Sequence, residues 1–179
     1  MPDPRQTRFL EIFNQVSTLV EERYGVPVVI SDVPHPFTGD LDGTEIQINY
    51  ENNPEEASFC LVHLFGHTVQ WNVCAEARDL GIAQLTQPHP SLIEALRRYE
   101  LEACGYSLQL FHEAGIDDVD QWLSDFAACD LAYLEHFYRT GEKKPFRSFW
   151  RDGTDLIDPV AIPDFQPTKW RGRWEGVVI

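Results

Sequence analysis

Two histidines four residues apart, His63 and His67, lie in a stretch that the sequence predicts to be one helix over residues 55–71. Asn53 and Pro54 precede this stretch, and acidic residues fill its first turn, as is common where helices begin. Side chains four residues apart on a helix lie nearly one above the other. Any fold that contains this helix therefore places both imidazoles on the same face of it.

This spacing suits the first two ligands of a tetrahedral zinc site. At about 100° per residue, Cys60, Gln70 and Cys74 fall in the same third of the helical wheel as the two histidines. Imidazole and thiolate are good ligands for a metal of borderline softness. A metal-free alternative stays open, in which these residues form a buried polar seam and the imidazoles hydrogen-bond to the backbone.

The residue after the first histidine, Leu64, limits what such a site can do. In the zinc-protease motif HExxH this position holds a glutamate, which acts as general base on the metal-bound water. A leucine side chain cannot accept a proton. The motif therefore indicates a site that can hold a metal but lacks the usual base. For hydrolysis, Glu102, Glu76 or an acid from the C-terminal tail would have to replace it.

Composition and charge exclude two classes of partner. The chain has 179 residues, of which 43% are hydrophobic and 24% charged, and this fits one globular domain with a substantial core. No apolar run approaches the roughly 20 residues of a membrane span. The formal net charge of −15 gives no basic surface for nucleic acid. We therefore expect no nucleic acid and no membrane, and a protein or peptide partner that the sequence does not identify.

Cysteine usage points to a reducing compartment. No two cysteines form a CxxC pair, and all of them fall in predicted helices: Cys60, Cys74, Cys104 and Cys129. This favours free thiols over a disulfide framework. Residues 1–5 show no basic region followed by an apolar core, so we expect no signal peptide. The expectation is a cytoplasmic protein.

Helices and strands are segregated along the chain. The predicted order is a helix over 5–24, strands over 26–31 and 45–49, the histidine helix, an irregular stretch over 80–89, and helices over 92–114 and from 117 or 118 to 140. Asp42-Gly43 is a good hairpin turn between strands. Such an order favours an α+β fold over alternating βαβ units. We expect an N-terminal helix beside a small, strongly bent sheet, with the histidine helix and the helix over 92–114 side by side beneath it.

The C-terminal part differs in composition from the rest. We expect a domain over residues 1–141 and an arm over 142–179 packed on that same domain. Prolines punctuate the arm, and it carries the aromatic residues Phe146, Phe149, Trp150, Phe165, Trp170 and Trp174. Segments this rich in aromatic side chains pack against their own domain rather than remain disordered.

Taken in order, these pieces resemble the ImmA/IrrE-type metallopeptidases, a zincin family. The matching residues are 43–49, 54–59 and 61–67. In that family a strand ending in Ile-x-Ile/Val-Asn leads into a helix with Phe-x-x-Ala-His-Glu-x-x-His. Its downstream Glu-x-Glu-Ala-Asn/Asp pattern is matched by residues 100–104 at four of five places. The resemblance covers about residues 5–112 and implies a zincin-like fold of the gluzincin type.

The resemblance implies that Glu100 is the third zinc ligand. The helical wheel of residues 92–111 also favours Glu100, which falls inside the apolar sector near Cys104, whereas Glu102 lies at the edge of that sector. An unpaired carboxylate in an apolar sector is costly unless it meets a metal or a donor. The alternative is that Glu100 pairs with Arg97 one turn earlier.

Two departures from the family pattern bear on activity. Leu64 removes the base, and Cys104 stands where the family has an Asn or Asp that would hydrogen-bond to a ligand. Gln70 can hydrogen-bond across the site, and Tyr106 can polarise a bound carbonyl. Our leading hypothesis is a zincin-like, zinc-binding protein that is a catalytically impaired peptidase homologue and acts as a binding or regulatory module. The alternatives are an active metal-dependent hydrolase with another base, and a metal-free structural or interaction protein.

Overall fold

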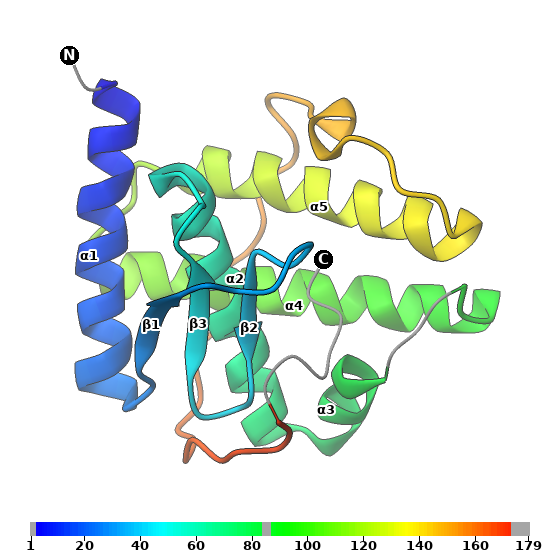
Figure 1. Cartoon of the computed structure of the whole chain (residues 1–179), viewed down its shortest axis with the longest axis horizontal. Coiled ribbons are helices and arrows are strands. Elements are labelled where there is room, and N and C mark those ends of the chain that lie inside the picture. The colour runs from blue at the N-terminus through cyan, green and yellow to red at the C-terminus, as the bar shows by residue number, and fades with distance from the viewer. Residues whose placement is uncertain (1–2, 84–86, 173–179) are drawn as a thin grey trace.

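The computed structural model of the chain describes residues 3–83 and 87–172, so Trp174 and the rest of the arm beyond residue 172 lie outside it. In chain order the elements are α1 (Pro4–Tyr24), β1 (Val28–Ser31), β2 (Gly39–Leu41), β3 (Ile46–Asn49), α2 (Pro54–Val73), α3 (Ala75–Ile82), α4 (Pro90–Glu113), α5 (Asp120–Thr140) and the 3-10 helix η1 (Phe146–Phe149) (Figure 1). The segregation of strands and helices confirms the α+β class.

The strands of the described residues form one small mixed sheet in the order β1-β3-β2. Strand β3 is parallel to β1 and antiparallel to β2, so Ile46 lies opposite both Val28 and Leu41. The expected turn lies between β2 and β3. There, Oδ1 of Asp42 accepts hydrogen bonds from the two backbone N–H groups that follow Gly43. Gly43 has a φ of 101°, a conformation that glycine adopts without strain.

Strand β3 is more buried than its sequence pattern predicts. Alternation of polar and apolar residues predicts one solvated face, yet Gln47 is only 4% and Asn49 only 8% exposed. The Gln47 amide accepts a hydrogen bond from Ser31 and donates one to Glu45. Because β3 is the central strand and its polar side chains are hydrogen-bonded by neighbours, burial costs them little.

Helix α2 is the centre of the molecule. It packs on the sheet through β2 and β3, on α1 at one side and on α4 at the other (Figure 1). The helix begins with a capping box, in which the Asn53 side chain accepts from the backbone N–H of Glu56 and the Glu56 carboxylate accepts from that of Asn53. The arrangement agrees with the expected pair of helices side by side beneath a sheet.

Residues 75–82 form helix α3, although the sequence analysis predicted no helix there and expected residues 80–89 to be irregular. None of the side chains of α3 is buried and its N-terminus has no side-chain cap, so the sequence carries little of the usual helix signal. Tertiary contacts hold the segment instead. The Arg78 guanidinium donates to the Trp71 carbonyl at 3.1 Å and lies 3.7 Å from the ring centre of Trp170.

The described part of the arm, residues 142–172, is tied to the domain at several separate points. The buried carboxylate of Asp125 on α5 accepts hydrogen bonds from the backbone and the hydroxyl of Thr154 at 2.8 and 2.7 Å. Near the far end, the backbone N–H of Trp170 donates to the carbonyl of Asp42 at 2.8 Å. The arm therefore reaches from α5 back to the β2–β3 turn (Figure 1).

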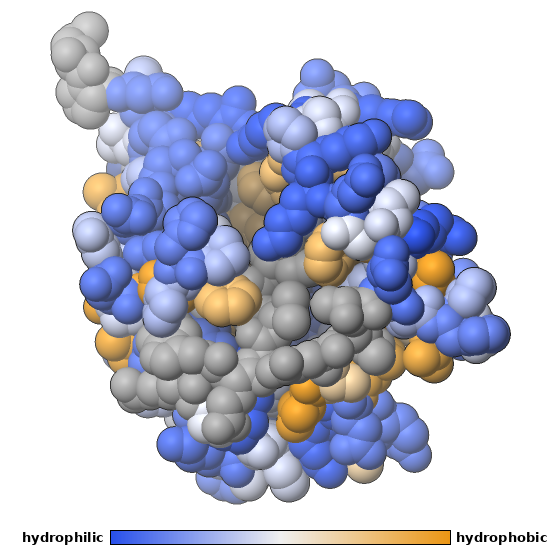
Figure 2. Space-filling view, turned by 45° about the vertical axis from the view of Figure 1, so that its right-hand side comes forward, coloured by the Kyte–Doolittle hydropathy of each residue, from blue (hydrophilic) through white to orange (hydrophobic). Residues whose placement is uncertain are grey.

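The surface of the face seen in Figure 2 is mostly hydrophilic, and a recess between hydrophilic side chains exposes hydrophobic residues in its upper half. Among the described helices, none combines the length and the hydropathy that crossing a membrane requires.

Candidate metal centre

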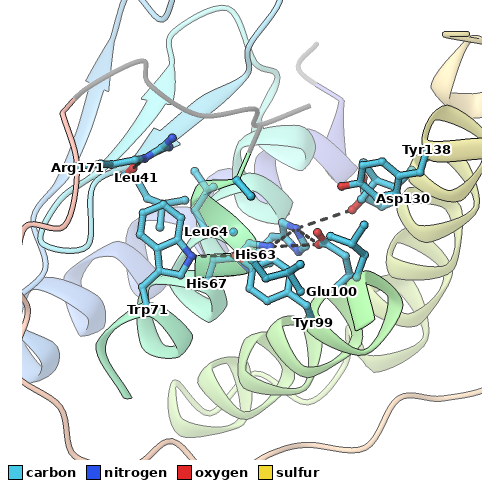
Figure 3. Close-up of a pocket in the computed structure, with 15 residues that line it drawn as sticks. Leu41, His63, Leu64, His67, Trp71, Tyr99, Glu100, Asp130, Tyr138 and Arg171 are labelled. Atoms are coloured by element: carbon cyan, nitrogen blue, oxygen red, sulfur yellow. Dashed lines mark hydrogen bonds and ion pairs between the residues drawn. The ribbon is translucent and has the colours of Figure 1, made fainter. Parts of the chain in front are cut away.

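The two imidazoles and one carboxylate converge on a single point (Figure 3). Nε2 of His67 lies 3.0 Å from Nε2 of His63 and 3.1 Å from Oε2 of Glu100, and Nε2 of His63 lies 3.2 Å from the same oxygen. Together these three side chains form a group that could hold a metal ion. The alternative ion pair of Glu100 with Arg97 does not form, because Arg97 pairs with Glu135 at 3.3 Å.

Close packing of α2 against α4 brings the three side chains together. A Cβ atom added at Gly66, inside the histidine motif, would lie 2.2 Å from the carbonyl oxygen of Ala103. Only glycine at this position lets the helix backbones approach so closely. One turn later on α4, the Ser107 hydroxyl donates to the carbonyl of Val62 at 2.8 Å. Glu100 therefore faces the histidines across a tight helix–helix contact.

A chain of hydrogen bonds orients His67. Its Nδ1 lies 2.9 Å from Oε1 of Gln70, whose Nε2 donates to the carbonyl of Tyr99 at 2.9 Å and to Glu102 at 2.6 Å. Both partners of Gln70 Nε2 are acceptors, so the amide oxygen must face the imidazole. That oxygen can only accept, and Nδ1 of His67 therefore carries the proton. Nε2 of His67 is therefore the nitrogen that faces Glu100 and His63, and it can bind a metal ion when it carries no proton.

His63 is held by less polar neighbours. Its ring stacks on Phe59 with centroids 5.2 Å apart, and its Nδ1 lies 3.7 Å from the sulfur of Cys104. Burial raises the pKa of Cys104 against the opposing influence of His63, so this residue remains a thiol. Cys104 thus occupies the place of a hydrogen-bonding neighbour, as the sequence analysis expected of that position, with the weaker bonding of sulfur.

The charges of Glu100 and the two histidines are strongly coupled. Burial raises the pKa of Glu100, but the charge of His67 and the hydrogen bonds of both imidazoles outweigh it and hold that pKa well below the usual value. Burial lowers the pKa of His63, but the Cys104 and Glu100 contacts outweigh it and raise that pKa well above the usual value. A buried carboxylate kept ionised between two imidazoles is neutralised by a proton or by a metal ion.

Asp130 on α5 is a further acid at the site, which the sequence analysis did not single out. Its Oδ2 lies 3.8 Å from Nε2 of His63, and the residue is 8% exposed. Burial raises the pKa of Asp130 to about 7, opposed by His63 and reinforced by Glu100. The signal that could have found it is the one that selected Glu100, an acid on the buried face of an amphipathic helix.

A small cavity of about 70 Å³ lies over the three converging groups. Its walls include both histidines, Glu100 and Asp130, together with Leu41, Leu64, Trp71, Leu96, Tyr99, Leu134, Tyr138 and Arg171 (Figure 3). This volume has room for a few water molecules or an ion with its waters, and is too small for the body of an organic substrate. Leu64 makes one wall aliphatic where the family motif has its base.

Two phenols line this cavity, and neither is the expected one. The ring of Tyr99 stacks on His67 with centroids 4.4 Å apart, and Tyr138 enters from α5 (Figure 3). Tyr106 is buried but does not line the cavity. Cys60 also lies away from the converging atoms, since its thiol donates to the carbonyl of Thr38 at 3.6 Å.

The substitute bases named from the sequence do not line the cavity. Glu76 is on the exposed helix α3 and accepts from the Cys74 thiol at 3.4 Å. Glu102 accepts from Gln70 on the outer side of His67. No acid from the arm, as far as residue 172, is among the lining residues. Besides Glu100, Asp130 is the acid among the residues that line this cavity.

Compared with protein families, with curated proteins and with solved structures, the chain matches none. The resemblance to ImmA/IrrE-type metallopeptidases therefore rests on the motif residues. The structure supports an α+β fold and a group of His63, His67 and Glu100 that could hold a metal ion. The finer expectation of a zincin fold is not confirmed.

Proposed function

We propose that His63, His67 and Glu100 bind a divalent metal ion, with zinc as the best fit, and that the centre serves a metal-dependent hydrolase in which Asp130 replaces the base lost at Leu64. The observation that carries the proposal is the convergence of two Nε2 atoms and one carboxylate oxygen, 3.0–3.2 Å apart, beside a second buried acid, Asp130.

The donor set fits zinc in kind and in size. Two imidazoles and one carboxylate are a common three-ligand set, and they leave a fourth position open. Tetrahedral ligands at about 2.0–2.1 Å from zinc are about 3.3 Å from one another. The observed separations of 3.0–3.2 Å need an outward shift of only a few tenths of an ångström. The hydrogen-bond chain behind His67 supplies the orientation that such a ligand needs.

Residues around the cavity divide the chemical work. A bound divalent ion supplies a Lewis acid that polarises a carbonyl and makes water more acidic. Asp130 is the group that can accept and return a proton there. It lines the same cavity as the three candidate ligands and is not one of them. Tyr138 lines the same cavity and is a hydrogen-bonding group for a polarised oxygen, whereas the Tyr99 hydroxyl already accepts from the Trp71 indole at 2.9 Å. Leu64 and Leu41 contribute apolar wall to this cavity.

A second candidate is the catalytically impaired homologue that acts as a binding or regulatory module. Leu64 favours it, and so does the arm. Arg171 donates to the Leu41 carbonyl at 3.0 Å and pairs with Asp40 at 2.8 Å, with both side chains buried. The end of strand β2 is thus occupied by the chain itself, which would hinder an extended peptide from pairing there.

The first test is the metal content of protein purified without a histidine tag, measured by mass spectrometry before and after dialysis against zinc. We expect one zinc per chain. The Glu100→Gln variant should lose it, because a neutral amide is a poor ligand. Glu135→Gln, which removes an acid of the α5 surface, is the matched control and should keep it. If the parent protein takes up no zinc under these conditions, the metal proposal is wrong and the metal-free structural or interaction protein is the remaining hypothesis.

The second test is hydrolysis by zinc-loaded protein of unfolded casein, of short peptides and of small esters. Chelator-sensitive turnover by the parent protein supports the hydrolase. Turnover gained only by Leu64→Glu would instead identify an impaired homologue that kept its ligands. This variant restores the carboxylate at the position where the family motif has it.

A further inference from the structure

A second and larger cavity, of about 420 Å³, adjoins the candidate metal centre. His63, Leu64 and Asp130 line both cavities. The remaining walls come from the loop before β2, from α2 and α5, and from the start of the arm, as Pro36, Phe37, Thr38, Glu56, Phe59, Cys60, Phe126, Tyr133, Lys143, Phe146 and Arg147. Its volume lies within the roughly 300–1,000 Å³ of small-molecule sites.

The inner part of this cavity is aromatic. Phe59 stacks on Phe126 with centroids 3.9 Å apart and on His63 with centroids 5.2 Å apart. Phe146 closes the wall from the arm and packs on Phe126 at 5.5 Å. A ligand body that fits these walls is a ring or a branched aliphatic group, because such surfaces pack by contact area and by stacking.

The mouth is positively charged despite the acidic chain. Lys143 and Arg147 line the cavity and are both exposed, so their charges lie at its opening. Arg147 lies over the Phe126 ring at 5.2 Å, and its nearest carboxylate, Glu55, is 3.8 Å away and closer to Arg5, at 2.7 Å. The guanidinium therefore keeps capacity for another anion.

The acids of this cavity do not cancel that charge at the mouth. Asp130 lies at the buried inner end beside His63. Glu56 is exposed, and its carboxylate caps its own helix by accepting from the N–H of Asn53 at 3.4 Å. In a chain with a net charge of −15, two cations at one opening create a local field that favours a small anion.

We propose that this cavity binds a small amphipathic acid, with an aromatic or branched aliphatic body against the phenylalanines and a carboxylate at Lys143 and Arg147. As a substrate class, this means an ester or amide whose apolar acid-bearing part fills the large cavity while its scissile carbonyl faces the small one. This second statement rests on the proposed function. Binding of the acid itself does not, because the apolar walls and the cations are independent of the metal.

The probe pair is naphthaleneacetate and naphthylethylamine, which share a body and differ in charge. Calorimetric titration of the full chain should show the acid binding about tenfold more tightly than the amine. Each titration is run on chelator-treated and on zinc-loaded protein. Acid binding that persists without zinc separates this proposal from the metal proposal, and either can then fail alone.

Matched variants locate the binding. Replacing Lys143→Gln and Arg147→Gln together should remove most of the preference for the acid, while Lys144→Gln, an exposed neighbour that does not line the cavity, should leave it unchanged. Phe146→Ala should lower the affinity for naphthaleneacetate about fivefold. Phe149→Ala is its control, because this residue of the same short helix packs on Tyr133 and lies outside the lining.

Three outcomes would overturn the proposal. Equal affinity for the acid and the amine would remove the charge argument, and equal effects of Phe146→Ala and Phe149→Ala would place the ligand elsewhere. Binding of neither probe to protein whose melting temperature is that of the parent would show that the cavity does not accept such bodies. Because both phenylalanines are only half-buried, each variant is expected to fold.

Discussion

The two cavities share His63, Leu64 and Asp130 but differ in size, lining and origin. The small one is walled mainly by α2, α4 and α5 and holds the converging imidazoles and carboxylate. The large one is aromatic, is open at a cationic mouth and takes part of its wall from the start of the arm, whereas Arg171, near the far end of the described arm, lines the small one. A cluster of buried polar groups and a set of aromatic walls therefore meet at one histidine, His63. The predictions below measure the effect of each change on both cavities separately.

The largest effect is expected for Asp130→Asn in zinc-loaded protein. The amide cannot take a proton, so hydrolysis should fall about 10²–10⁴-fold, while zinc content and naphthaleneacetate binding should stay within a few-fold of the parent. Kinetics and metal analysis on the same sample check this. Unchanged turnover would assign proton transfer to another group, and lost zinc would make Asp130 a ligand.

A smaller effect is expected for Gln70→Met, a variant of similar volume without the amide. His67 loses the acceptor that fixes its Nδ1 proton, so zinc affinity should drop about 10–100-fold. Competition with a fluorescent zinc chelator measures the change. Gln109→Met, on α4 and outside both cavity linings, is the control. Equal affinities for the two variants would mean that the Gln70–Glu102 chain does not support the metal centre.

Gly66→Ala tests the close contact that places Glu100. The added methyl would meet the Ala103 carbonyl at 2.2 Å, so the helix backbones must separate. We expect a loss of about 1–3 kcal/mol in the free energy of unfolding together with weaker zinc binding. Chemical denaturation checks the stability. Gly153→Ala is no suitable control because of its positive φ, so Ala127→Gly on α5 serves as the comparison for backbone effects. A variant as stable as the parent would show that α2 and α4 can separate freely.

The smallest effect concerns the arm and its dependence on pH. Burial raises the pKa of Asp125, but hydrogen bonds from Thr154, Gln121 and Gly153 outweigh it, and the pKa is lowered. A lowered pKa contributes stability above the ordinary value for aspartate, about 4, and this contribution is lost as pH falls through the folded value. The melting temperature should therefore fall more steeply below pH 4, roughly, for the parent than for Asp125→Asn.

The Asp125 variant also bears on the comparison of the two cavities. At neutral pH, Asp125→Asn should lower the free energy of unfolding by about 1 kcal/mol. It should also weaken the binding of naphthaleneacetate, because the arm forms part of the large cavity. Zinc affinity should change little. Parallel profiles of melting temperature against pH for the parent and Asp125→Asn would show that the hydrogen bonds of Asp125 do not hold the arm.

Much of the candidate metal centre could be predicted from the sequence, because its geometry is local. His63 and His67 face one way on any helix with about 3.6 residues per turn. The wheel of the next long helix separates Glu100 from Glu102 by burial alone, and Gln70 lies one turn beyond His67. Helix spacing and the cost of burying an unpaired carboxylate follow from the local sequence and do not depend on which segments pack together.

Only the tertiary structure decided the rest. Asp130, the two cavities, helix α3 and the burial of Gln47 depend on which surfaces meet, and no local periodicity encodes this. Tyr106 was expected at the site and Tyr99 is there instead, because helix α4 turns its Tyr99 face toward His67 once Gly66 has brought the helices together. Local periodicity fixes which side chains could act as ligands. Packing between distant segments determined what surrounds them, since contact partners follow from the whole fold.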